Sequence, residues 1–576
     1  MTTNSTSAAA PQAAERKTEG IFGELKHIQR IYGYLPASQI KQVAERRGIY
    51  VRDVHAVASF YPHFHLKKPA RVNVKVCTDM TCHLRGSGTL YESLRQRFRN
   101  AADIDFSLRS ASCFGRCDRA PAIAVNDVCF DGVTETSAAQ VIDQTLLGIQ
   151  PAAVAHEGEG PKLLTDPYDG KRTYDVLQRL LAEPKWEEAI GVLRESGLRG
   201  MGGAGFPTGM KWEAVRDADS DEKFIICNAD ESEPGTIKDR FIMWHLPHLV
   251  IEGMIIAGLI TGAKKGIIYI RHEYAEQEHI LQKEIERCYQ KKILGENILV
   301  SGLRFELSIF VSPGGYICGE ETALLEALEG KRAEPRNKPP FPVMHGLWNK
   351  PTVINNVETF AFATAILAKG AQWFKSHGKN GAFGLKFVGV SGDVERPGVF
   401  EVPMGTTYAE LINDHAGGPP VGKKVIGFAP SGPSSGYLPA SMLDLPLDWN
   451  AVAKAGSMVG SGAIVVCAEG ACMLDMALNA VRFYRNESCG KCVPCRVGSQ
   501  KLVDMLTEWT QGKFKESDLA LLDDLSHTLR QTSICGLGQI LPAPIQSVIK
   551  HFRPEIDEHI LHRRCAAGVC FKTGNA

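Results

Sequence analysis

The sequence predicts a multidomain α/β protein with helical segments near both ends. Helical periodicity occurs over residues 21–68 and returns after residue 469, whereas strand-like and helix-like segments alternate over 165–380. Residues 381–468 are rich in strand-like segments punctuated by glycine and proline. With 576 residues, the chain is long enough for about three to five domains.

The composition excludes some classes of partner. The formal net charge is zero, so no basic field points to nucleic acid or to an anionic membrane. The longest apolar stretch, residues 249–263, contains Glu252 and is too short to span a bilayer, so we predict a buried helix. Residues 1–20 are polar and are predicted to form a disordered leader, not a signal peptide. Sixteen cysteines without an export signal indicate metal or redox use in the cytoplasm.

The sequence of the N-terminal half predicts two structural units. Residues 21–68 contain three helical stretches joined by short Gly/Pro segments, which is typical of a small helical bundle. Over 69–150 a strand, a helix, a second strand and a hairpin follow one another, and this order fits a thioredoxin-like domain. Residues 151–164 are a polar linker.

The C-terminal half predicts a nucleotide-binding α/β domain over 165–380 and a compact β-grasp-like module over 381–468. A helical domain over 469–553 and a tail over 554–576 follow.

Two cysteine quartets predict iron–sulfur clusters. Cys489, Cys492 and Cys495 have the C-x2-C-x2-C spacing that holds three corners of a [4Fe–4S] cube, and Cys535 beside a glycine is the fourth ligand. A zinc site with four cysteines is the alternative. The second quartet is Cys77, Cys82, Cys113 and Cys117. Its C-x4-C and C-x3-C pairs suit a [2Fe–2S] rhomb, with structural zinc or two unrelated pairs as the alternative.

A glycine-rich loop and an acidic cluster predict a site for a phosphate-bearing cofactor. The loop glycines are Gly200, Gly202, Gly203 and Gly205. Their bare N–H groups could cradle a phosphate, with Lys211 adding positive charge, although the spacing differs from a Rossmann fingerprint. Asp230, Glu231 and Glu233 follow and could bind sugar hydroxyls. A tight turn and a solvated acidic face are the alternative.

A third segment places a tyrosine, two glutamates and an aromatic on loops. Tyr316 follows two glycines, and Glu320 and Glu321 open a helix. Lys338 and Phe341 lie on a Pro-rich loop where an aromatic face could stack a base. Taken alone, an aromatic such as Phe341 is more often a core residue than a ligand.

These motifs resemble a known family. "GGAGFPTGMKW", "CNADESEPGT", "YICGEET", "KPPFP", "NNVET" and "ESCGKCVPCR" with "ICGLG" are similar to the flavin- and NADH-binding subunit of respiratory complex I. The first 150 residues resemble its thioredoxin-like [2Fe–2S] companion, and the likeness covers residues 20 to 550. Such fused chains resemble the diaphorase (β) subunits of NAD-dependent formate dehydrogenases and NAD-reducing hydrogenases. Residues 431–449 look closest to the formate dehydrogenase kind.

The resemblance implies FMN and NAD(H) as cofactors, a Rossmann-like FMN domain and an SLBB-type β-grasp. It implies that FMN is held by Gly200, Gly202, Lys211, Asn228, Asp230, Glu231, Tyr316, Gly319, Glu320, Glu321, Asn355 and Asn356. It implies that the dinucleotide is received by Phe206, Glu233, Lys338 and Phe341, with the two aromatics stacking on adenine. Glu233 and Glu320 are the expected catalytic residues. Met201 and Ala214 depart from the family pattern, where relatives carry an arginine and an aromatic.

The implied function is electron transfer between NAD(H) and a partner. The [4Fe–4S] cluster would be the first station after FMN, and the [2Fe–2S] cluster a side acceptor. The expected partner, in a hetero-oligomer, is a catalytic subunit with a molybdenum or tungsten pterin and further iron–sulfur clusters. The alternatives are a hydrogenase, a quinone-reducing complex or a bifurcating assembly as partner, or a non-catalytic iron–sulfur protein.

The C-terminal tail contains one more set of potential ligands. Cys565 and Cys570 lie close to His559 and His562. The pair resembles one found in some electron-bifurcating relatives. It predicts an additional metal or cluster, with two ordinary thiols as the alternative.

Overall fold

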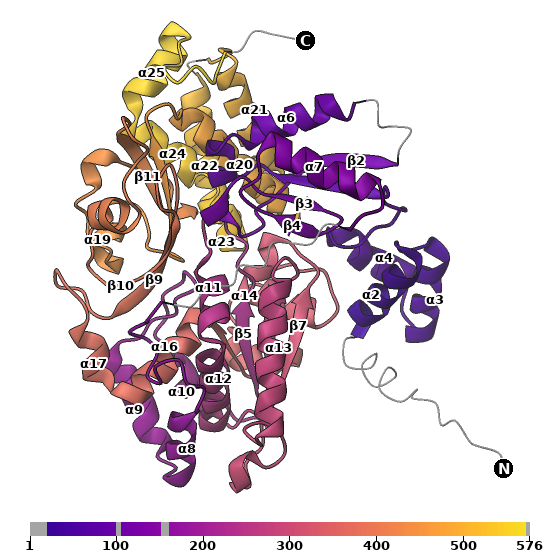
Figure 1. Cartoon of the computed structure of the whole chain (residues 1–576), viewed down its shortest axis with the longest axis vertical. Helices are drawn as coiled ribbons and strands as arrows, with labels where there is room; N and C mark the ends of the chain where they lie inside the picture. The colour runs from indigo at the N-terminus through magenta and orange to yellow at the C-terminus, as the bar shows by residue number, and fades with distance from the viewer. Residues whose placement is uncertain (1–19, 100–104, 151–160, 516, 572–576) are drawn as a thin grey trace.

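The computed structural model of the chain describes residues 20–99, 105–150, 161–515 and 517–571 (Figure 1). The predicted leader, except its last residue, and most of the linker over 151–164 therefore lie outside the described residues. The predicted multidomain α/β architecture is confirmed: two α/β units, a β-rich module and helical segments near both ends.

The N-terminal helices form a small bundle that packs on the central domain. They are α2 (Gly20–Tyr32), α3 (Ala37–Arg47) and α4 (Val51–Phe60). Their apolar periodicity buries one face of each helix, and α3 ends at Gly48 in the left-handed conformation that favours glycine. Phe22 contacts the ring of Phe310 in the central domain, and Tyr61 donates a 2.6 Å hydrogen bond to the Lys331 carbonyl.

The thioredoxin-like domain is built on a four-stranded sheet in the order β2-β1-β3-β4. Its elements are β1 (Val72–Cys77), α5 (Met80–Leu84), α6 (Ser87–Arg97), β2 (Phe106–Ala111), η2 (Cys117–Arg119), β3 (Ile123–Val125), β4 (Val128–Phe130) and α7 (Glu135–Leu146). β2 runs parallel to β1, whereas β3 and β4 form the predicted hairpin. Asn126 and Asp127 at its turn have positive φ, a conformation that Asn and Asp tolerate.

The central domain has a parallel sheet in the order β7-β6-β5-β8. Its strands are β5 (Phe224–Ala229), β6 (Lys265–Arg271), β7 (Glu306–Ser312) and β8 (Thr352–Asn356). Its helices are α8 (Asp175–Ala182), α9 (Trp186–Ser196), α10 (Thr208–Asp217), α11 (Lys238–His245), α12 (Pro247–Thr261), α13 (Ala275–Gln290), α14 (Glu321–Leu328), α15 (Pro342–His345), α16 (Val357–Lys369) and α17 (Ala371–Ser376), with short turns η3 (Ile298–Val300), η4 (Tyr316–Gly319) and η5 (Leu347–Asn349).

The apolar stretch at 249–263 forms most of α12, and the prediction of a buried helix is confirmed. The buried carboxyl of Glu252 accepts hydrogen bonds from Tyr168 and from the Leu177 amide. Across the described residues, no single helix has the length and apolar character needed to cross a membrane. α11 and α12 meet that test only when taken together, and they are bent by 92°.

The β-grasp module contains a mixed sheet in the order β10-β9-β13-β11-β12, where β13 is parallel to β9. Its elements are β9 (Leu385–Gly392), β10 (Gly398–Pro403), α18 (Tyr408–Glu410), η6 (Leu411–His415), β11 (Val425–Pro433), β12 (Leu438–Pro439), η7 (Ala440–Met442), α19 (Trp449–Lys454) and β13 (Ala463–Ala468). Helix α20 follows β13 after a short turn, so this module is joined directly to the C-terminal helices.

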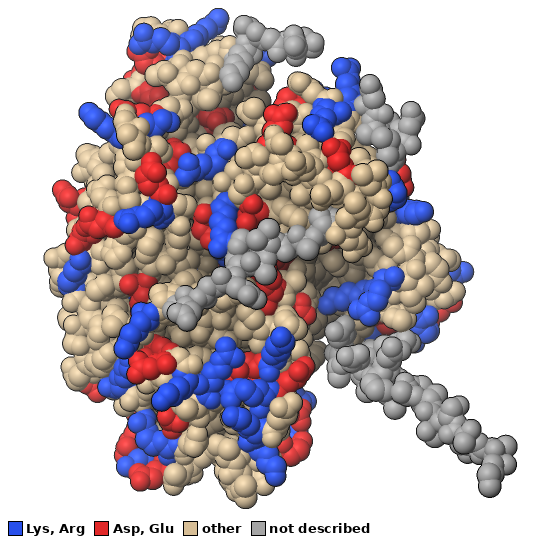
Figure 2. Space-filling view, viewed as in Figure 1, with Lys and Arg blue, Asp and Glu red and all other residues tan. Residues whose placement is uncertain are grey.

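The C-terminal domain is helical, as predicted. It contains α20 (Met473–Glu487), α21 (Val493–Thr510), α22 (Ser517–Thr532), α23 (Gly536–Ile540), α24 (Ala543–His551) and α25 (Arg553–His562). In Figure 1 these helices lie above the central domain, between the β-grasp module and the thioredoxin-like domain. Figure 2 shows acidic and basic side chains interspersed over the face drawn, in keeping with the zero net charge.

Candidate active site

A cavity of about 480 Å³ opens beside the carboxyl ends of β5 and β8, where open α/β sheets bind ligands. Asn228 and Asn356 lie at these strand ends and line the cavity. The structure brings all twelve residues expected at FMN to its walls: Gly200, Gly202, Lys211, Asn228, Asp230, Glu231, Tyr316, Gly319, Glu320, Glu321, Asn355 and Asn356.

The glycine-rich loop forms one wall of the cavity. A Cβ on Gly202 would lie 3.1 Å from the Asn356 Cβ, so a larger residue would push the loop away from β8. Lys211, on α10, donates a 2.9 Å hydrogen bond to the Ile354 carbonyl, and burial lowers the pKa of its ammonium. An ammonium group has three donors, so Lys211 keeps further donors for an anion.

Three carboxyls line the cavity: Glu231 is buried, and Asp230 and Glu233 are half-buried. Burial raises the pKa values of Asp230, Glu231 and Glu233 to about 7 each. One carboxylate oxygen of Asp230, Oδ2, is buried without a hydrogen-bond partner. An unpartnered buried oxygen facing a cavity fits a ligand that carries hydroxyl or N–H donors.

Glu231 and Glu233 have different partners. Glu231 accepts hydrogen bonds from the Asp239 and Arg240 amides and from the Tyr274 hydroxyl. Glu233 instead faces the β-grasp module and accepts a 3.2 Å hydrogen bond from the Ser434 amide. Glu231 is therefore fixed within its own domain, whereas Glu233 joins two domains across the cavity.

Glu320 and Lys338 lie together at the edge of the cavity. Glu320 accepts hydrogen bonds from the Thr322 and Ala323 amides and so caps α14. Lys338 Nζ lies 2.9 Å from a Glu320 oxygen and 2.7 Å from a Glu321 oxygen. The contacts with backbone amides hold Glu320 in place. Lys338 lies beside it as a cation at the rim of the cavity.

The two predicted aromatics are placed differently. Phe206 lines the cavity and remains 49% exposed. Phe341, 53% exposed, lies on the Pro-rich loop and does not line the cavity. Met201 and Ala214 also lie outside the lining: Met201 is buried in the core, and its amide donates to the Thr359 hydroxyl.

Sequence reasoning missed part of the cavity wall. The β-grasp module contributes Ser434, Met458, Gly460 and Ser461, the segment after Cys535 contributes Gly536, Leu537 and Ile540, and the start of α11 contributes Lys238 and Asp239. The serine- and glycine-rich stretches "SGPSSG" and "GSG" are the signal that could have pointed to the β-grasp contribution. The cavity is thus walled by three domains.

The cysteines predicted to hold the [4Fe–4S] cluster converge near this cavity. Cys492 precedes α21, Cys495 lies in its first turn, and Cys535 precedes α23. Burial, and to a smaller extent the neighbouring Cys492, Cys535 and Cys489 sulfurs, raise the pKa of the Cys495 thiol to about 12, although its hydrogen bond with Ser488 acts in the opposite direction. Because Gly536 and Leu537 line the cavity, this quartet adjoins the cavity wall.

The cysteines predicted to hold the [2Fe–2S] cluster are all buried. The Cys113 and Cys117 sulfurs are 3.5 Å apart, and Cys77 interacts with both Cys82 and Cys113. The amide of Gly235, in the central domain, donates a 3.2 Å hydrogen bond to the Cys117 sulfur. The central domain therefore closes over this quartet.

Two arginines and a glutamate connect this quartet to the cavity. Arg271 donates to the carbonyls of both Glu231 and Cys113, at 2.5 and 2.6 Å. Arg240 donates to the Gly115 carbonyl. Glu487, just before the [4Fe–4S] loop, accepts from the Ser112 hydroxyl and from the Tyr316 amide. Both quartets are consequently linked to the cavity by buried or partly buried contacts.

Comparisons with known proteins identify the family. Residues 193–365 match the Nuo51 FMN-binding domain, residues 8–146 a thioredoxin-like [2Fe–2S] ferredoxin, 387–437 an SLBB domain, and 475–559 the iron–sulfur binding region of NADH-ubiquinone oxidoreductase-F. An NADH-quinone oxidoreductase subunit of Rhizobium meliloti (strain 1021) is 42% identical over 402 residues, which are 70% of this chain and 96% of that protein. The chain belongs to the Nuo51 FMN-binding family.

Other members and a solved structure extend this likeness. The NADP-reducing hydrogenase subunit HndC of Solidesulfovibrio fructosivorans is 42% identical over 70% of this chain and 82% of its own length. A crystal structure of NAD+-reducing [NiFe]-hydrogenase in the H2-reduced state superposes with a TM-score of 0.84 at 31% identity, covering 94% of both chains. This Nuo51 family member is therefore a diaphorase-type oxidoreductase subunit that acts on NADH with FMN.

The residues present fit the cofactors of a Nuo51 protein. The cavity offers the backbone of the glycine-rich loop, a lysine and an unpartnered Asp230 oxygen, which match the phosphate and hydroxyl groups of FMN. The Gly200 amide is not bare as the sequence predicted, because it donates a 2.8 Å hydrogen bond to the Phe206 carbonyl. The two thiol quartets match the [2Fe–2S] and [4Fe–4S] clusters named for their domains, so the iron–sulfur interpretation holds over zinc. The alternative of an iron–sulfur protein without turnover does not account for the flavin domain.

Proposed function

We propose that this chain is the NAD(H)-linked diaphorase subunit of a cytoplasmic NAD-dependent formate dehydrogenase. Its partner would be a catalytic subunit with a molybdenum or tungsten pterin and iron–sulfur clusters, in a hetero-oligomer. The observation that supports the diaphorase part is one cavity whose wall is linked to both cysteine quartets: Arg271 joins the Glu231 and Cys113 carbonyls, and Gly536, next to Cys535, lines the cavity. Bound FMN supplies the needed chemistry, because it exchanges electrons in pairs with nicotinamide and singly with clusters.

The proposed roles of the side chains follow from their places. Lys211 and the loop backbone at Gly202 would hold the phosphate end of FMN, and Asp230 would bind its hydroxyls. Gly200, whose amide donates to the Phe206 carbonyl, would shape the loop around the phosphate. The other cavity residues expected at FMN are Asn228, Glu231, Tyr316, Gly319, Glu320, Glu321, Asn355 and Asn356. They would line the ring and ribityl chain and keep water away from the reacting groups.

The dinucleotide would enter from the open side of the cavity. Phe206 would stack on the adenine, Lys338 would contact a phosphate, and Phe341 would contribute only from the outer rim. Glu233 lines the cavity with a pKa of about 7, so its carboxyl can accept from or donate to a bound ligand near neutral pH. We therefore propose that Glu233 positions the nicotinamide portion, and that Glu320 acts by capping the start of α14 at the cavity.

The formate assignment rests on residues 431–449, which resemble the formate dehydrogenase kind and contribute Ser434 to the cavity wall. The sequence contains no motif that binds molybdopterin, tungsten or nickel, so the substrate site belongs on another subunit. The cytoplasmic placement is supported by sixteen cysteines that are all free thiols.

The contact surface for the partner is proposed at the start of α21. Val493 and Val497, one turn apart, are each 58% exposed beside the [4Fe–4S] cysteines. Lys491, also exposed, donates a 2.7 Å hydrogen bond to the Pro335 carbonyl. An exposed apolar pair next to a redox site fits docking of another iron–sulfur subunit, through which electrons would leave.

The second candidate is the diaphorase subunit of an NAD-reducing hydrogenase. It is favoured by the match over 94% of both chains to the hydrogenase structure. Purification of the complex from its native host separates the two. Formate-driven reduction of NAD+, with molybdenum or tungsten in the complex, supports the first. Nickel in the complex, with a response to hydrogen and not to formate, would replace it with the second.

A further inference from the structure

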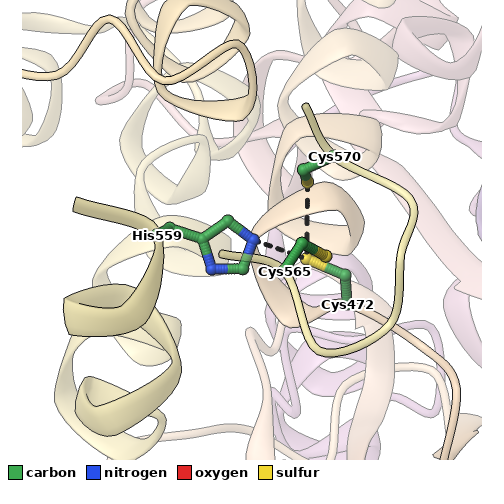
Figure 3. Close-up of side chains that lie close together, drawn as sticks. All are labelled: Cys472, His559, Cys565 and Cys570. Atoms are coloured by element: carbon green, nitrogen blue, oxygen red, sulfur yellow. Dashed lines mark hydrogen bonds between the residues drawn. The ribbon is translucent and has the colours of Figure 1, made fainter. Parts of the chain in front are cut away.

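A third group of metal ligands lies apart from both cysteine quartets. Cys472, His559, Cys565 and Cys570 present three sulfurs and one ring nitrogen that all lie within 4.8 Å of one another (Figure 3). Cys472 and His559 are buried, and the two tail cysteines are half-buried. Within the described ranges, no other set of three or more such ligand atoms is so compact.

The distances in this group match a tetrahedron around one ion. The Cys472 sulfur lies 3.4 Å from His559 Nε2 and 3.7 Å from the Cys570 sulfur. With Zn–S near 2.3 Å and Zn–N near 2.0 Å, the edges of a tetrahedral zinc site are about 3.5–3.8 Å. The sulfur pair is far beyond the ~2.05 Å of a disulfide, and all three cysteines are free.

His559 is oriented for metal binding. Its Nδ1 lies 2.8 Å from the Glu555 carbonyl oxygen, which can only accept, so Nδ1 carries the proton. Nε2 is then the unprotonated nitrogen, and Figure 3 shows it facing the Cys472 sulfur. The Glu555 carboxylate accepts from the Met473 amide at 2.8 Å and so fixes α25 against the start of α20. These contacts are typical of the outer ligands that support a zinc-bound histidine.

The loop between Cys565 and Cys570 completes the group. Gly568 allows the loop to turn back through a positive φ of 67°. The backbone N–H groups of Val569 and Cys570 point at the Cys565 sulfur. Backbone amides that point at a cysteine sulfur stabilise a thiolate, the form that binds metal.

We propose that Cys472, His559, Cys565 and Cys570 bind one structural zinc ion through three thiolates and one imidazole. Four protein ligands close the coordination sphere, which is the pattern of a structural and not a catalytic zinc site. Cys472 lies 87 positions before His559 in the chain, so the ion joins segments that are distant in sequence. His562, one turn beyond His559, is exposed and lies outside the group.

The zinc ion would hold the tail against the rest of the C-terminal domain. Cys472 immediately precedes α20, directly after the β-grasp module, and α20 leads at its other end to Cys489. The amide of Phe571, just after Cys570, donates a 3.0 Å hydrogen bond to the Thr510 carbonyl at the end of α21. The site therefore joins α20, α25 and the tail, and it stabilises the helices that carry the [4Fe–4S] ligands.

Metal analysis of the purified complex tests this inference. The native complex should contain about one zinc per chain in addition to its iron, and Cys570→Ser should lower zinc at least about tenfold. Zinc-edge X-ray absorption should report three sulfur neighbours and one nitrogen neighbour. Iron and flavin contents should stay unchanged in the variant, which also shows that it has folded.

A matched histidine variant and a proteolysis measurement provide further tests of the zinc site. His562→Gln, a matched histidine one turn away, should retain zinc, whereas His559→Gln should lose it. Cleavage by trypsin at the exposed Arg563 and Arg564 should be slow in the native complex and several-fold faster in Cys570→Ser. Iron in place of zinc at the site, or full zinc content in both Cys570→Ser and His559→Gln, would overturn the proposal.

Discussion

The two cysteine quartets of this chain differ in how far solvent can approach them. Cys77, Cys82, Cys113 and Cys117 are all buried, with at most 4% of each residue exposed. In the other quartet only Cys495 is buried, while Cys489, Cys492 and Cys535 are half-buried. Exposed valines flank the second quartet, whereas the first is covered by the Gly235 segment and buried arginines.

This difference in burial indicates different electron-transfer roles for two sites that are linked to one cavity. The buried quartet is held by contacts within the chain, so its described surroundings leave little room for a partner to approach. The half-buried quartet adjoins both the cavity and the surface. Electron exit to a partner is therefore expected at the [4Fe–4S] site, with the [2Fe–2S] site as a side acceptor.

The largest expected effect comes from Cys535→Ser. Removing one ligand of the half-buried quartet should lower partner-linked NAD+ reduction by about a hundredfold or more, because the cluster loses a corner. Reduction of an artificial dye by NADH should be retained, since a dye can react at the cavity itself. Steady-state assays with both acceptors measure this, with Cys129→Ser as a control thiol outside either quartet. Unimpaired partner-linked turnover would contradict the proposed exit.

Glu233→Ala tests the cavity to which both quartets are linked. Loss of a half-buried carboxyl that is proposed to contact the ligand should cost about 2 kcal/mol, or about 30-fold in KM for NADH. Bound flavin should remain, because Glu233 faces the β-grasp module and not the glycine-rich loop. Flavin content by absorbance and KM by dye reduction provide the measurement. A variant that loses flavin and keeps its affinity for NADH would reverse the assignment.

Val497→Asp tests the surface beside the half-buried quartet. A carboxylate at this exposed position leaves the fold intact but must be desolvated on docking, so partner affinity should fall about tenfold. Size-exclusion chromatography and partner titration measure this effect, and NADH–dye activity should not change. Val421→Asp, at a 96% exposed valine of the β-grasp module, is the matched control and should leave affinity unaltered.

The smallest expected effect comes from Cys77→Ser in the buried quartet. If the [2Fe–2S] site is a side acceptor, partner-linked turnover should stay within about twofold of the native rate. The electron paramagnetic resonance signal of the [2Fe–2S] cluster should disappear from the reduced protein. A loss as large as that of Cys535→Ser would remove the distinction between the two quartets.

Much of the cavity could be predicted because its motifs lie at the ends of parallel strands. Asn228 and Asn356 follow buried strands, and parallel strands bring their carboxyl ends to one edge. Ser434 and Ser461 could not be predicted in the same way. They enter the site through the packing of a separate module, 201 positions from Glu233 in the case of Ser434, and no local pattern records that approach.

The C-terminal ligand group likewise contains residues that could be predicted from the sequence and one that could not. Proximity in sequence predicted Cys565, Cys570 and His559 as a set and added His562, which faces solvent. Cys472 was not predicted, because its contact with His559 depends on how α25 packs against the start of α20. Local spacing identifies ligands within one turn or loop, whereas tertiary packing determines which distant residue completes the set.

The burial of one quartet also constrains how the protein is made. Cys117 is covered by the Gly235 amide, and Arg271 closes over the Cys113 carbonyl, so a protein that delivers iron and sulfide cannot reach these thiols after the domains have docked. The N-terminal domain leaves the ribosome first and has its own sheet, so it can receive its cluster while it is still alone. The half-buried quartet can still receive its cluster after the domains have docked. Maturation of this chain should therefore be ordered, with the innermost cluster inserted first.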